Sequence, residues 1–153
     1  MVRAYEKYAW VIYLALGLLW LVVGLNQIFL PDGLIGNDVQ RVTGMSLSEL
    51  EASNPVAIEL VRFVYGALGN LKINWSFLVL AITLTGYRKG EKWAWYTLWL
   101  VPAILVSMGI FNAIFFSDVN QSLESIPIVS ISLLGLLLPI RRFFPRKPQS
   151  GNV

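Results

Sequence analysis

The sequence predicts an all-α protein, a four-helix transmembrane bundle with a short amphipathic helix in the first outer loop. The chain has 153 residues and is 56% hydrophobic but only 14% charged, whereas soluble domains carry about 25% charged residues. Its apolar residues gather in four runs, and Lys and Arg residues flank these runs. The length fits one domain rather than two, and the low charge is typical of a chain whose main solvent is lipid.

The first apolar run is long enough to cross a hydrocarbon core of ~30 Å at about 1.5 Å per residue. The first run exceeds the roughly 7–15 residues of a signal-peptide core, and no Ala-x-Ala-like site follows it, so we interpret it as a permanent helix. Pro102 predicts a kink in the third span, and Pro127 and Pro139 lie near the ends of the short fourth span. The predicted spans are about 9–30, 66–87, 93–116 and 124–140, within a single domain of residues 1–142.

The second helix is expected to begin well before its membrane span. Asn54 suits the N-cap position and Pro55 the first turn, where a missing N–H is not needed. A helix from Pro55 to Tyr87 is longer than a bilayer requires. Its first turns are therefore expected to stand outside the membrane or to tilt against the preceding loop.

Lys and Arg residues gather on one side of the predicted topology, and most acids lie on the other. The positive-inside rule therefore predicts a multi-pass protein of the cell membrane with cytoplasmic N- and C-termini. Residues 143–153 are polar and are expected to form a disordered cytoplasmic tail. The basic residues on the cytoplasmic side are Arg3, Lys7, Arg88, Lys89, Lys92, Arg141, Arg142, Arg146 and Lys147.

Aromatic residues are expected to mark the cytoplasmic boundary of the membrane, because Trp and Tyr favour the headgroup region. This aromatic belt consists of Trp10, Tyr13, Tyr87, Trp93, Trp95 and Tyr96.

The outer loop, residues 31–54, is the largest polar segment between two spans. Pro31-Asp32-Gly33 is typical of a turn. Ser46-Leu47-Ser48-Glu49 fits a capping box and predicts the start of the short helix, with Leu47 and Leu50 facing the membrane or the bundle. The loop either caps the ends of the helices or acts as a lid or docking surface.

The chain contains no Cys and no His. This excludes disulfides, zinc fingers, iron–sulfur clusters and Ser-His or Cys-His catalytic pairs, and we predict no catalytic residue, no metal and no cofactor. Asp32 and Asp38 are the best candidates for a hard metal ion, but two loop acids are more often plain solvated charges. Nucleic acid is not an expected partner, because the basic residues lie beside apolar runs rather than on a basic face.

Polar residues inside the spans are the candidate functional residues, because burying them without a partner is expensive. Three helices place amides at a similar depth beneath the outer loop, and Glu59 and Arg62 are spaced to pair at i, i+3. Gly66 and Gly69 share their helix face and would let another helix or a ligand approach. The candidate ligand-binding residues are Asn26, Gln27, Glu59, Arg62, Asn70, Asn74 and Asn112.

Two interpretations of these residues remain open. They line a small pocket that opens to the outer leaflet, or their amides are interhelical contacts worth ~0.6 kcal/mol each. Lys72 either belongs to the pocket or extends towards the outer headgroups. On the third span, Ala103-x-x-x-Ser107 and Gly109-x-x-x-Ala113 predict helix packing, either inside the bundle or with another subunit.

The segment Arg88-Lys89-Gly90-Glu91-Lys92-Trp93-Ala94-Trp95, the four-helix layout and the loop sequence Thr43-Gly44-Met45 resemble small bacterial and archaeal four-helix proteins of the DoxX-like kind. The resemblance implies a four-helix membrane bundle. The broader group includes subunits that accompany membrane oxidoreductases. No catalytic residue of that group maps onto this chain.

Three functions are compatible with these features. The first is a non-catalytic accessory or scaffold subunit of a membrane complex, in contact with other membrane subunits or a homo-oligomer. The second is a binder or carrier of a small or lipid-like ligand in the outer-leaflet pocket. The third is a lipid enzyme with Glu59 as acid or base and Lys72 or Arg62 holding an anion, which is the weakest because there is no His to assist the carboxylate.

Overall fold

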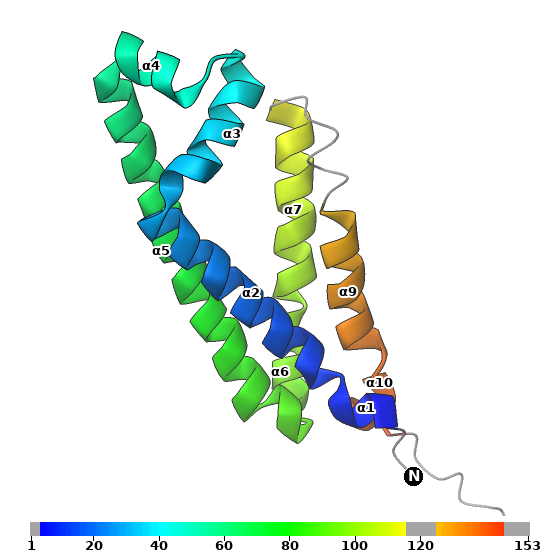
Figure 1. Ribbon diagram of the computed structural model, residues 1–153. Coiled ribbons are helices and arrows are strands. Elements are labelled where there is room, and N and C mark those ends of the chain that lie inside the picture. The colour runs from blue at the N-terminus through cyan, green and yellow to red at the C-terminus, as the bar shows by residue number, and fades with distance from the viewer. Residues whose placement is uncertain (1–3, 116–124, 146–153) are drawn as a thin grey trace, which may run out of the picture. The chain divides into compact units, whose positions relative to one another are not determined.

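The computed structural model describes residues 4–115 and 125–145, and these contain helices and no strand (Figure 1). The basic residues Arg3, Arg146 and Lys147, the beginning of the predicted fourth span and the predicted tail beyond residue 145 lie outside the described residues. The helices are α1 (Ala4–Tyr8), α2 (Trp10–Phe29), α3 (Pro31–Thr43), α4 (Leu47–Ser53), α5 (Pro55–Thr85), the 3₁₀ helix η1 (Tyr87–Lys89), α6 (Lys92–Leu98), α7 (Leu100–Phe115), α9 (Ile126–Leu137) and α10 (Ile140–Phe143).

Four helical stretches of the described residues are long and apolar enough to cross a membrane, as the sequence predicted. The early start of the second stretch is confirmed, because α5 begins at Pro55 and the Asn54 side chain accepts a hydrogen bond from the Ala57 N–H at 3.1 Å. At 31 residues, α5 is about 46 Å long, which exceeds a hydrocarbon core. The four stretches are Glu6–Phe29, Pro55–Lys89, Lys92–Ile114 and Ile126–Phe143.

The chain divides into two compact units, Gly17–Leu78 and a second unit formed by Met1–Leu16 with Val79–Val153. In the Gly17–Leu78 unit, α2 and α5 cross at two glycines. A Cβ on Gly69 would lie 2.8 Å from the Gly24 carbonyl oxygen, and a Cβ on Gly24 would lie 2.9 Å from the Gly69 oxygen. Gly66, which we expected to share this role, has no atom within 4 Å of its hypothetical Cβ. Of the two glycines predicted to allow close approach, only Gly69 therefore lies where α2 and α5 cross.

The segment predicted as an outer loop consists of two helices. Pro31-Asp32-Gly33 does not form the expected turn, because Pro31 starts α3 instead. Proline at the first helical position and an acid in the first turn also favour a helix N-terminus. The helix ends at Gly44, whose φ of +73° is in the left-handed region that glycine adopts without strain.

Helix α4 begins with the predicted capping box. The Ser46 side chain accepts from the Glu49 N–H at 3.2 Å, and the Glu49 carboxylate accepts from the Ser46 N–H at 2.7 Å. Leu47 packs towards α3, because its Cβ lies 3.9 Å from a Cβ built on Gly36. The short helix is therefore held by its own cap and by α3.

In the other unit, segments from all four apolar stretches meet at α9. The Tyr13 hydroxyl donates to the Ser132 carbonyl at 2.8 Å, the Tyr87 hydroxyl donates to the Gly135 carbonyl, and the Trp95 indole N–H donates to the Leu136 carbonyl at 3.0 Å. Pro139 has no N–H, so it cannot donate to the Gly135 carbonyl four residues earlier. Tyr87 supplies the missing donor.

The aromatic belt is only partly a surface feature. Tyr13, Tyr87 and Trp95 are buried, with 0%, 1% and 9% of their surface exposed, and the Tyr13 and Tyr87 rings meet edge to face with centroids 5.5 Å apart. Trp93 and Tyr96 remain 51% and 58% exposed. The buried three are core residues whose polar atoms bind the backbone of α9, and this burial is not what a belt at a membrane boundary requires.

The kink predicted at Pro102 is present as a break between α6 and α7 at Trp99. Proline leaves the carbonyl four residues earlier, on Leu98, without its helical donor. The helix resumes at Leu100, and the Ala103 N–H bonds the Trp99 carbonyl at 3.3 Å.

Candidate functional site

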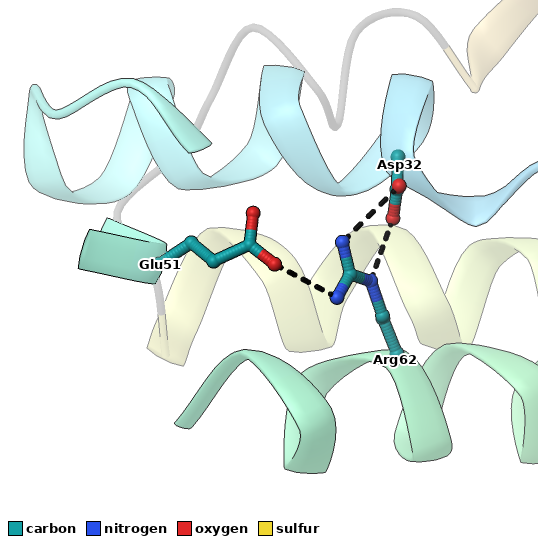
Figure 2. Close-up of polar contacts among 3 residues, drawn as sticks. All are labelled: Asp32, Glu51 and Arg62. Carbon is teal, nitrogen blue, oxygen red and sulfur yellow. Dashed lines mark hydrogen bonds and ion pairs between the residues drawn. The ribbon is translucent and has the colours of Figure 1, made fainter. Parts of the chain in front are cut away.

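The densest polar site in the described residues centres on Arg62 of α5 (Figure 2). Its guanidinium binds Asp32 of α3 through two bonds, Nε to Oδ1 at 2.8 Å and Nη2 to Oδ2 at 3.2 Å. The remaining Nη1 donates to Glu51 of α4 at 3.1 Å. Such a bidentate pair fixes geometry as well as charge, so one side chain ties α3 and α4 to α5.

A second group of polar contacts surrounds Asp38 of α3. Arg41 binds its Oδ1 at 2.7 Å, and the Tyr65 hydroxyl donates to its Oδ2. The partly buried Lys72 on α5 lies within electrostatic reach of Asp38. Asp38 therefore makes a second connection between α3 and α5.

We call Asp32, Asp38, Arg41, Glu51, Arg62, Tyr65 and Lys72 the cap cluster. Its three carboxylates and three cations balance, so the cluster as a whole carries no net charge. A site that binds a charged substrate usually presents an excess of the opposite charge. In the cap cluster, Asp32 and Glu51 pair with Arg62 and Asp38 pairs with Arg41, as expected of a structural connection.

Hydrogen bonds lower the pKa of two carboxylates in the α3–α4 segment. Hydrogen bonding to the Arg62 guanidinium holds the pKa of Asp32 below its ordinary value of 3.8. The Ser46 backbone N–H, and after it the Ser46 hydroxyl, lower the pKa of Glu49. Both carboxylates are open to solvent, where screening weakens such pairs.

Acid is therefore expected to weaken the Asp32–Arg62 connection between α3 and α5. A carboxylate whose pKa is lowered by folding contributes stability above its ordinary pKa, and that contribution is lost as the pH falls through the lowered value. For Asp32 the loss spans the range from pH 3.8 downwards. A ¹³C titration of the Asp32 carboxyl in detergent micelles measures it, and the Arg62→Gln variant should return the midpoint towards 3.8. An unchanged midpoint would exclude the guanidinium as the cause.

Glu59 and Arg62 do not form the ion pair that the sequence predicted. Glu59 is exposed and makes no ion pair within residues 4–115 and 125–145, so the predicted Glu59–Arg62 pair is wrong. Arg62 turns to Asp32 and Glu51 because two carboxylates from other helices offer it three hydrogen bonds. An exposed i, i+3 pair contributes only about 0.2–0.5 kcal/mol.

Two of the predicted amides contact each other within the Gly17–Leu78 unit. Asn70 and Asn74 contact each other on α5, where the Asn74 Nδ2 donates to the Asn70 carbonyl at 3.0 Å and to its Oδ1 at 3.2 Å. Asn26 is exposed on α2, and Asn112 is partly buried in the other unit. A pocket formed by these four residues therefore stays a prediction.

Gln27 is the exception among the amides. It is only 7% exposed, and its Oε1 is buried without a hydrogen-bond partner within the described part of the chain. Its Cβ lies 3.0 Å from a Cβ built on Gly69, at the close crossing of α2 and α5. A buried acceptor of this kind costs about 1–3 kcal/mol unless a donor reaches it.

The candidate residues predicted from the sequence do not contain Asp32, Asp38, Glu51 or Tyr65. Asp32 was assigned to a turn, although its place in the first turn after Pro31 also favours a helix N-terminus. Given a helix from Pro31, Asp32 and Asp38 lie about six residues apart on it, and both acids could have been sought as partners of the cations on α5.

A different surface lies on α7 and α9, which run side by side (Figure 1). Here an open groove of about 500 Å³ is lined almost wholly by apolar side chains. Ala103 and Ser107, one turn apart on α7, line it, and the Ser107 hydroxyl is bonded to the Ile104 carbonyl at 2.8 Å. The larger side chains of the lining are Trp99, Val106, Ile110, Val129 and Leu133.

Comparison with known proteins finds no matching family model, no matching curated protein and no matching solved structure.

Proposed function

We propose that this chain is a non-catalytic membrane protein that serves as an accessory or scaffold subunit of a membrane complex. In this proposal the four apolar stretches form one bundle in the cell membrane, with both termini in the cytoplasm. The distribution of Lys and Arg supports the orientation, and the contacts of Tyr13, Tyr87 and Trp95 with α9 support the bundle. The DoxX-like kinship inferred from Arg88 to Trp95 belongs to the same proposal.

The groove on α7 and α9 is the observation that carries this function. Its lining belongs to two stretches that are apolar enough to span a membrane, so its occupant lies within the bilayer. Ala103 and Ser107 form a small-x-x-x-small pair, which lets a second backbone approach closely. The Ser107 hydroxyl is already satisfied by its own helix, so the occupant needs no polar group at this depth.

A transmembrane helix from a partner subunit is the occupant that fits this groove. The small residues lie one turn apart along α7, which matches the repeat of a helix packed along it. A lipid acyl chain also fills apolar grooves, but it gains nothing from the small residues in particular. Transmembrane helices associate through such packing and not through a hydrophobic difference from lipid.

The test is native mass spectrometry of the protein extracted gently from its own membrane. The wild-type chain should retain other polypeptides, and Ala103→Leu with Ser107→Leu should lose them because leucine fills the groove. Ala113→Leu makes the same kind of change on α7 at an exposed position outside the lining, and it should retain them. Retention of the same partners by the groove variant, or lipid as the only companion of the wild type, would overturn the proposal.

The cap cluster supports a structural role for the α3–α4 segment. Arg62 binds Asp32 and Glu51 through three hydrogen bonds, and Asp38 is shared by Arg41 and Tyr65. These bonds hold two short helices against α5, which suits an outer cap better than a lid that must open. In the proposed orientation this cap lies on the outer side of the membrane.

A second candidate function, a binder or carrier of a small or lipid-like ligand, rests on Gln27 alone. Its buried Oε1 is suited to accept a hydrogen bond from the N–H or O–H group of a ligand. The same spectra should then show a defined small mass on the wild type and none on Gln27→Leu. If nothing binds there, Gln27→Leu should instead be at least as stable as the wild type, because it removes an unpaired buried acceptor.

A further inference from the structure

The exposed side of α5 carries a regular stripe of residues within the Gly17–Leu78 unit. The steps along it alternate between three and four residues, which is the repeat of helices that pack along their length. Leu60, Phe63 and Phe77 are 62%, 73% and 57% exposed, and the residues between them are exposed as well. We call this the α5 stripe, and its members are Leu60, Phe63, Ala67, Asn70, Asn74 and Phe77.

Two amides in this stripe distinguish it from an ordinary lipid-facing surface. Asn74 lies roughly 17 Å along α5 from Thr85, and Asn70 roughly 22 Å, at about 1.5 Å per residue. Both distances fall inside a hydrocarbon core of ~30 Å measured from the end of the helix that precedes Arg88 and Lys89. Polar side chains at such depth rarely face lipid, because each unsatisfied group is expensive there.

The contact between the two amides leaves each with one unused group. The Asn74 Nδ2 donates to the Asn70 carbonyl and to the Asn70 Oδ1. Within the described residues, the Asn74 Oδ1 and the Asn70 Nδ2 make no hydrogen bond. Each α5 helix thus offers the Asn74 Oδ1 as an acceptor and the Asn70 Nδ2 as a donor, and the donor of one helix can bind the acceptor of another.

We propose that the α5 stripe binds the same stripe of a second copy of this chain. Every copy inserts into a membrane with the same orientation, so two α5 helices meet in parallel and each residue of the stripe faces its own counterpart. The Asn70 donor of one copy then reaches the Asn74 acceptor of the other, and the same bond forms again across the two-fold axis. Ala67 allows close approach, and a paired asparagine sets the register of parallel helices.

This association rests on the membrane placement in the proposed function, but it is independent of the α7–α9 groove. The groove lies in the other unit and involves none of the stripe residues. A failure of the groove variant to lose partners leaves the pairing of α5 unaffected, and a monomeric protein leaves the groove proposal unaffected.

Cysteine cross-linking in the native membrane tests the pairing directly. The chain has no cysteine of its own, so Phe63→Cys and Ala67→Cys each introduce a single thiol. Both should give a disulfide-linked dimer on mild oxidation, because each residue faces its counterpart. Leu68→Cys is the matched control, since Leu68 is 44% exposed on α5 but lies outside the stripe, and it should not form the disulfide-linked dimer.

A second measurement tests whether Asn70 and Asn74 stabilise the dimer. The dissociation constant of the dimer is measured by energy transfer between labelled copies as they are diluted with lipid. Asn70→Leu with Asn74→Leu removes two interhelical bonds and should raise this constant about tenfold. Cross-linking at Leu68 but not at Ala67, a product with the mass of a different polypeptide, or a dissociation constant unchanged by the double substitution would overturn the proposal.

Discussion

Gly69→Ala is expected to push α2 and α5 apart. The added methyl group would lie 2.8 Å from the Gly24 carbonyl oxygen and 2.9 Å from the Ile28 side chain. Backbone cannot yield as a flexible side chain does, so the two helices must separate. Overpacking of this kind costs typically 1–3 kcal/mol, and we expect about 2–3 kcal/mol of the free energy of unfolding here because the obstacle is backbone.

Gly66→Ala provides a closely matched control. Gly66 lies one turn before Gly69 on the same helix, and its added methyl group meets no atom within 4 Å. Alanine also favours helix over glycine by up to about 1 kcal/mol. In an SDS titration of mixed micelles followed by tryptophan fluorescence, Gly66→Ala should match or exceed the wild type. If Gly66→Ala and Gly69→Ala lower the free energy of unfolding equally, the close crossing at Gly69 is not the cause of the loss.

Tyr87→Phe is expected to be the most damaging removal of a single oxygen atom. The Tyr87 hydroxyl is the donor that Pro139 cannot supply to the Gly135 carbonyl, and Tyr87 is 1% exposed, so water cannot replace it. A buried acceptor left without a partner costs about 1–3 kcal/mol. The same SDS titration measures the loss.

Pro139→Ala separates this explanation from a general loss of packing. Alanine restores an N–H four residues after Gly135, so α9 can continue and satisfy that carbonyl itself. In the Pro139→Ala background, Tyr87→Phe should therefore cost markedly less, with a coupling energy of about 1 kcal/mol in a double-mutant cycle. Strict additivity of the two substitutions would show that the hydroxyl and the proline act on different groups.

Local signals predicted the helices of this chain well. The capping box at Ser46, the N-cap at Asn54 with Pro55 after it, and the break before Pro102 all appear where they were expected. Each depends on groups within about four residues of one another, so the amino-acid order alone contains the necessary information. The turn predicted at Pro31 failed because the same three residues also suit the start of a helix.

Contacts between residues far apart in the sequence could not be predicted in this way. The sequence placed Glu59, Arg62 and Gly69 on one face of a helix, but periodicity does not identify what lies opposite that face. It therefore suggested Glu59, the nearest acid along the chain, as the partner of Arg62. The arrival of α3 and α4 beside α5 supplied Asp32 and Glu51 with better hydrogen-bond geometry.

Signals along the chain predicted that this protein is helical, that it contains four stretches able to cross a membrane, and where α4 and α5 begin. Hydrophobic run length and backbone capping are sufficient for that, because both are properties of a single segment. The three-dimensional packing was needed to show which glycine lies at the crossing of α2 and α5, which aromatic side chains are buried, and which amides meet. Those outcomes depend on the distance between segments far apart in the chain, and on which of several similar groups offers the closest packing or the missing hydrogen bond.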